Sequence, residues 1–82
     1  MDLYNEIVDI IRNKVADIRH VDVETLDENS NLKYDYQIKS TEMVVVISAL
    51  EDEYDAYIDL MKLNKFDTIG EIAKFVQELL EG

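Results

Sequence analysis

The clearest helical pattern in the chain lies at residues 40–55, which read STEMVVVISALEDEYD. Large apolar residues recur there in every turn: Met43, Val46, Ile47, Leu50 and Tyr54. Residues spaced by three and four positions share one face of an α-helix, so this segment is predicted to bury that face. We expect a helix that begins at Ser40 or Thr41 and ends near Asp55.

The segment before this helix divides into a helix and a long loop. Residues 2–18 show the same helical periodicity, and Asp2 is a suitable N-terminal cap. Residues 19–39 show no helical periodicity and contain the turn-forming run DENSN at 27–31. Scattered apolar residues in this loop are expected to pin it to the core: Val21, Val23, Leu26 and Leu32.

A last helix is predicted at residues 68–80. Thr68 followed by Glu71 has the form of a capping box. The expected buried stripe comprises Ile69, Ile72, Ala73, Val76 and Leu79. With a short helical turn at residues 60–64 and no strand pattern, the fold class is all-α. We expect a single domain over residues 1–82, with three main helices, one short helix and a long loop between the first two.

Charge and composition narrow the function. Eight Lys and Arg against 19 Asp and Glu give a net charge of −11, which argues against nucleic-acid binding and against an anionic membrane surface. Basic protein surfaces would attract such a chain. There is no cysteine, and the longest apolar run, residues 43–50, is too short to span a bilayer. The N-terminus lacks a signal-peptide pattern, so a cytoplasmic protein is expected. We also expect the protein to be a monomer.

No catalytic or metal site is expected from the sequence. Residues 27–31 begin like a calcium-binding loop, but that loop needs Gly at its sixth position and Glu at its twelfth. This chain has Leu32 and Ile38 there, so calcium is rejected. His20 is the only histidine and has no cysteine partner, so no catalytic triad can be assembled and an enzyme is not expected.

Ser40 stands where the long loop turns into the second main helix, and two interpretations of it are open. It can be the N-terminal cap of the helix, a common role for serine. Alternatively, its hydroxyl can carry a phosphodiester, because a helix N-terminus stabilises negative charge. Ser40 alone favours the cap.

The chain resembles the acyl carrier proteins, most specifically over residues 32–76. The matching positions are Leu32 eight before the serine, Ile38 two before it, the segment ALEDEY at 49–54, Ile58, and the entry to the last helix at 66–72. The resemblance implies a small four-helix bundle that is not an enzyme. It also implies a 4'-phosphopantetheine arm on Ser40, which would carry an acyl or aminoacyl group as a thioester.

The resemblance further implies partners. A phosphopantetheinyl transferase would modify Ser40, and loading and processing enzymes with basic patches would dock on the second helix. The resemblance places docking at Glu42, Glu51 and Asp52. Docking is also expected at Val44 and Val45, which lie off the predicted buried face of the helix.

The chain departs from the family pattern around the serine. The departures are Gln37 for Gly, Lys39 for Asp, Thr41 for Leu, Val45 for an acid and Asp59 for Pro. They keep a second hypothesis open, in which the domain is an unmodified interaction module. That module would bind proteins through Val44, Val45, Leu60 and Met61.

Overall fold

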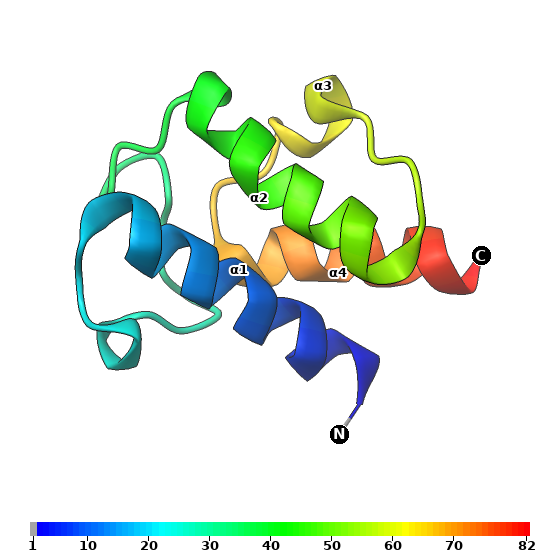
Figure 1. Cartoon of the computed structure of the whole chain (residues 1–82), viewed down its shortest axis with the longest axis horizontal. Coiled ribbons are helices and arrows are strands. Elements are labelled where there is room, and N and C mark those ends of the chain that lie inside the picture. The colour runs from blue at the N-terminus through cyan, green and yellow to red at the C-terminus, as the bar shows by residue number, and fades with distance from the viewer. Residues whose placement is uncertain (1) are drawn as a thin grey trace.

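The computed structural model describes residues 2–82 as a bundle of helices (Figure 1). The elements are α1 (Leu3–Arg19), the 3-10 turn η1 (Val23–Thr25), α2 (Ser40–Tyr54), α3 (Leu60–Leu63) and α4 (Ile69–Glu81). Within these residues the only β pairing is an isolated bridge between Asn31 and Thr68. The predicted all-α class, with three main helices, one short helix and a long loop, is confirmed.

Two of the helix starts follow the capping rules read from the sequence. The Asp2 side chain accepts a hydrogen bond from the Asn5 backbone N–H at 2.8 Å and so caps α1. At α4 the Thr68 hydroxyl accepts from the Glu71 N–H, and the Glu71 carboxylate accepts in return from the Thr68 N–H at 3.0 Å. This reciprocal arrangement satisfies N–H groups that have no partner inside the helix.

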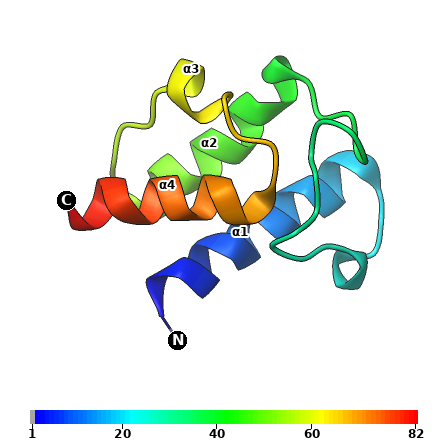
Figure 2. The ribbon, with the colours of Figure 1, turned by 180° about the vertical axis from the view of Figure 1, so that it is seen from behind.

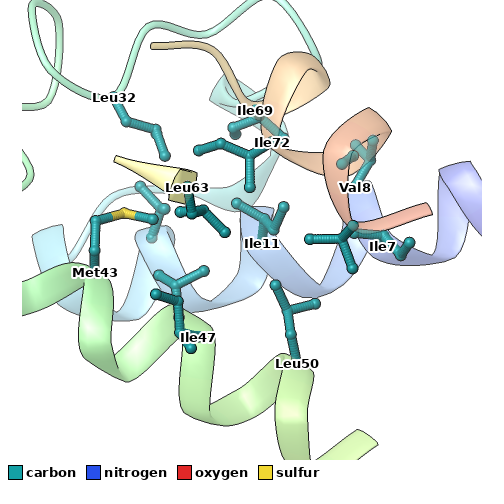
Figure 3. Close-up of a cluster of buried hydrophobic side chains, with 14 of the residues drawn as sticks. Ile7, Val8, Ile11, Leu32, Met43, Ile47, Leu50, Leu63, Ile69 and Ile72 are labelled. Carbon is teal, nitrogen blue, oxygen red and sulfur yellow. The ribbon is translucent and has the colours of Figure 1, made fainter. Parts of the chain in front are cut away.

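The core forms where α1 packs against both α2 and α4 (Figures 1 and 2). Figure 3 shows side chains from all three helices, with Leu63 of α3, meeting in one cluster. Leu50 of α2 is 0 % exposed and lies in this cluster. The buried face of α2 is the predicted one, with Met43, Val46, Ile47 and Leu50 inside.

The long loop is fastened to the core and to the start of α4. Leu26 and Leu32 are buried, as predicted. Backbone hydrogen bonds join the Ile69 N–H to the Ser30 carbonyl at 3.1 Å and the Leu32 N–H to the Asp67 carbonyl at 2.8 Å. The start of the segment that leads to Ser40 is therefore held by residues that follow it in the sequence.

Two predicted core positions are wrong. Leu79 is 45 % exposed, because Leu80 continues the stripe four residues after Val76 and is the residue packed on the core. Val21 is exposed because it directly follows His20, whose left-handed backbone ends α1 before the chain returns to the core at Leu26.

Candidate functional site

Ser40 is the first residue of α2, and its side chain is exposed. The N-cap position belongs to Lys39, which has extended backbone angles and makes no side-chain capping bond. The interpretation of Ser40 as the helix cap is therefore wrong. Its hydroxyl oxygen accepts one long hydrogen bond, from the Asn64 side-chain amide at 3.4 Å.

The start of α2 suits a phosphate group on this serine. Lysine has no side-chain oxygen to cap the helix, and the only carboxylate in the first turn, Glu42, binds the Lys39 N–H at 3.0 Å. The positive end of the helix dipole therefore faces Ser40, which favours negative charge there. An exposed hydroxyl without a capping role fits the attachment of a phosphodiester.

Arg19, the last residue of α1, lies beside this site and was not singled out from the sequence. Its guanidinium donates to the Tyr36 carbonyl at 2.7 Å and to the Gln37 carbonyl at 2.8 Å. It also donates to both oxygens of the Glu42 carboxylate, at 2.5 and 2.7 Å. The contact joins residues 23 apart in the sequence, so no local spacing indicated it.

Glu42 is consequently not a free surface acid. The hydrogen bonds from Arg19, followed by the one from the Lys39 N–H, lower the pKa of Glu42 from 4.5 to about 2. The same pairing raises the pKa of Arg19. The sequence has no base between Ser40 and Met61, but Arg19 of α1 pairs with Glu42 from outside this stretch.

This pairing predicts a defined pH response. Because the pKa of Glu42 is lower in the folded state, the ionised pair stabilises the fold fully above about pH 4.5, and this contribution is lost as the pH falls through about 2. An NMR titration of the Glu42 side-chain carboxyl carbon should show a midpoint near 2. In Arg19→Gln the midpoint should move up toward 4.5; an unchanged midpoint would contradict the pairing.

The other predicted docking residues differ in their exposure and in their hydrogen bonding. Val44 and Val45 are 47 % and 49 % exposed, one turn beyond Ser40. Asp52 is also exposed. Glu51 is half-buried, and its carboxylate accepts from the Ile58 backbone N–H at 2.8 Å, so it holds the chain between α2 and α3.

The interior beside the serine is closed. A void of about 10 Å³ lies among the loop, the start of α2, α3 and α4. Its lining is Leu32, Lys33, Ile38, Met43, Leu63, Asn64, Phe66 and Ile72. A single water molecule needs about that much space, so a larger group enters only if these elements separate.

The fold and the site together define a carrier-type domain: a small helical bundle with an exposed serine at the start of its second main helix. Comparison with known proteins agrees. Residues 9–76 match the family model described as "Phosphopantetheine attachment site". The chain is 32 % identical over 72 residues to the acyl carrier protein of Lactobacillus acidophilus, covering 88 % of this chain and 90 % of that one.

A second relative, the acyl carrier protein of a Picosynechococcus species, is 32 % identical over 73 residues, which is 89 % of this chain and 90 % of the relative. No solved structure matches significantly. The chain belongs to the phosphopantetheine attachment-site family, and phosphopantetheine is its cofactor. Among the helices described, none is long and apolar enough to cross a membrane.

Proposed function

We propose that Ser40 carries the 4'-phosphopantetheine arm and that the chain acts as an acyl carrier. The observation that carries this proposal is the geometry of the serine. Its hydroxyl is exposed at the first position of α2, while Lys39 takes the cap position. A serine kept for helix capping would accept a bond from an N–H of the first turn, and this one makes no such bond.

The polypeptide contributes position and charge to this function. The arm supplies a thiol on which an acyl or aminoacyl group is held as a thioester. The N-terminus of α2 would face a phosphodiester on Ser40, and Lys39, exposed beside Ser40, would offer it a positive charge. A cytoplasmic monomer that visits a phosphopantetheinyl transferase and then acyl-loading and acyl-processing enzymes fits this arrangement.

Intact-mass measurement on protein purified from its native host tests the proposal. A single phosphopantetheine adduct, located on the peptide that contains Ser40, is the expected result. Protein that remains unmodified under all growth conditions would favour the interaction module instead. The observation behind that alternative is the exposure of Val44, Val45 and Met61 on α2 and α3.

Docking of basic partners on the C-terminal half of α2 should depend on salt. The double reversal Asp52→Lys/Glu53→Lys changes two exposed side chains on that helix, and it leaves intact the Glu51 carboxylate that binds Ile58. Association with a loading enzyme is expected to slow at least tenfold, because electrostatic attraction raises encounter rates by about 10–1,000-fold. Stopped-flow association rates over a salt series measure this effect.

The control has the same change of net charge elsewhere. Asp17→Lys/Glu24→Lys alters two exposed acids on α1 and η1 and should slow association less. Both double variants should keep the melting temperature nearly unchanged, since exposed charges contribute little to folding. If neither added salt nor the double reversal on α2 changes the association rate, electrostatic docking is wrong. The contact would then be expected at Val44 and Val45.

A further inference from the structure

The backbone immediately before Ser40 is held by one guanidinium. Arg19 accepts no bond itself but donates to two successive carbonyls, those of Tyr36 and Gln37, at 2.7 and 2.8 Å. It also binds the Glu42 carboxylate, whose oxygen accepts the Lys39 N–H at 3.0 Å. The carbonyls at 36 and 37 and the N–H at 39 are thereby fixed to the end of α1.

The conformation held in this way is a costly one. Gln37 has a φ of 50°, in the left-handed region that residues with a Cβ seldom adopt. The bond from Arg19 to its carbonyl helps to maintain this conformation, together with the anchoring of Ile38, whose N–H binds the Leu32 carbonyl at 2.8 Å. Without Arg19, one of the bonds that hold Gln37 at a positive φ is lost, and residues with a Cβ generally favour negative φ.

The same helix carries a close counterpart at Arg12. Its guanidinium donates to the Leu26 and Val23 carbonyls at 2.8 and 3.0 Å and pairs with Asp9. The Arg12 and Arg19 side chains are similarly exposed, at 22 % and 27 %. Arg12 secures the part of the loop that is distant in sequence from Ser40, so it provides a matched control for Arg19.

We propose that Arg19 is a positioning residue for the modification of Ser40, holding residues 36–39 in the conformation that the phosphopantetheinyl transferase accepts. The inference rests on the proposed function. If Arg19 is lost, only a fraction of molecules presents the competent loop, and the apparent affinity of the transferase falls by that fraction. The loss therefore appears in KM and leaves kcat nearly unchanged.

The first experiment measures the loop without any modification. Amide hydrogen exchange of the Lys39 N–H should accelerate on the order of tenfold in Arg19→Ala. The reason is that Arg19 no longer holds the Glu42 carboxylate, which accepts the hydrogen bond of this N–H. Arg12→Ala should leave this exchange rate unchanged. Arg19→Lys, a milder change, should give an intermediate rate if Arg19→Ala folds poorly. Equal Lys39 exchange in the Arg19 and Arg12 variants overturns the proposal.

The second experiment measures transfer of the arm from coenzyme A by the host's transferase. KM for Arg19→Ala should rise about five- to tenfold at nearly constant kcat. Adding Gln37→Gly to Arg19→Ala should recover part of the loss, since glycine adopts a positive φ without steric cost. If wild type accepts the arm but the KM of Arg19→Ala equals that of Arg12→Ala, the positioning role of Arg19 is wrong and the proposed function still stands. If wild type accepts no arm at all, the proposed function fails.

Discussion

Ser40→Ala is expected to abolish phosphopantetheine attachment completely. The substitution removes the only oxygen to which the arm would be joined. It should leave the fold intact, because the hydroxyl is exposed and makes no capping bond. Intact mass after incubation with coenzyme A and the host's transferase measures the effect, and circular dichroism shows whether the helices remain.

Ser48→Ala is the matched control. Ser48 lies on α2 two turns after Ser40, and both side chains are exposed. Ser48→Ala should be modified as completely as wild type. A phosphopantetheine adduct that persists in Ser40→Ala and disappears in Ser48→Ala would show that the attachment site has been assigned to the wrong serine.

Leu50→Ala is expected to destabilise the fold by about 2–5 kcal/mol, through lost apolar burial and the cavity left behind. Leu50 is 0 % exposed in the cluster where α1, α2 and α4 meet (Figure 3). The total stability of a small domain is only about 5–15 kcal/mol, so the loss is a large share of it. Urea denaturation, with the m-value compared between variants, gives the change in unfolding free energy.

Leu79→Ala removes the same atoms from a surface position. Leu79 is 45 % exposed near the end of α4, so the expected loss is below about 1 kcal/mol. A similar cost at both leucines would indicate that the buried faces of α2 and α4 have been assigned wrongly. If Leu50→Ala lowers the unfolding free energy only slightly and the m-value is unchanged, that result alone would contradict the described packing of α2.

The helices and most of their buried faces could be predicted from sequence because helical periodicity is a local property. Met43, Val46, Ile47 and Leu50 lie three or four residues apart, and all are buried. The prediction was wrong at Leu79. Leu79 and Leu80 lie three and four residues after Val76, so either leucine could continue the buried stripe. Only packing against the rest of the bundle distinguishes Leu80 from Leu79.

The surroundings of Ser40 were less accessible to sequence reasoning. The position of the serine followed from its spacing to neighbouring motifs, but its hydrogen bonding did not. Lysine is an unexpected N-cap, since it has no acceptor atom, and the sequence therefore favoured Ser40 as the cap. The pairing of Glu42 with Arg19 depends on how the end of α1 meets the start of α2, which no local pattern encodes.

The backbone bonds between the long loop and the start of α4 have a consequence for the order of folding. Ser40 has been synthesised before Asp67 and Ile69, whose backbone groups fasten the loop at Leu32 and Ser30. Likewise, α1 has one face uncovered until α4 is made. During translation, Arg19 can hold residues 36 and 37 before Ser40, but the bonds of Ser30 and Leu32 to the start of α4 are still missing. The bonds from Asp67 and Ile69 form only after the last helix has been made, so complete fastening of the loop that leads to Ser40 is a late event in folding.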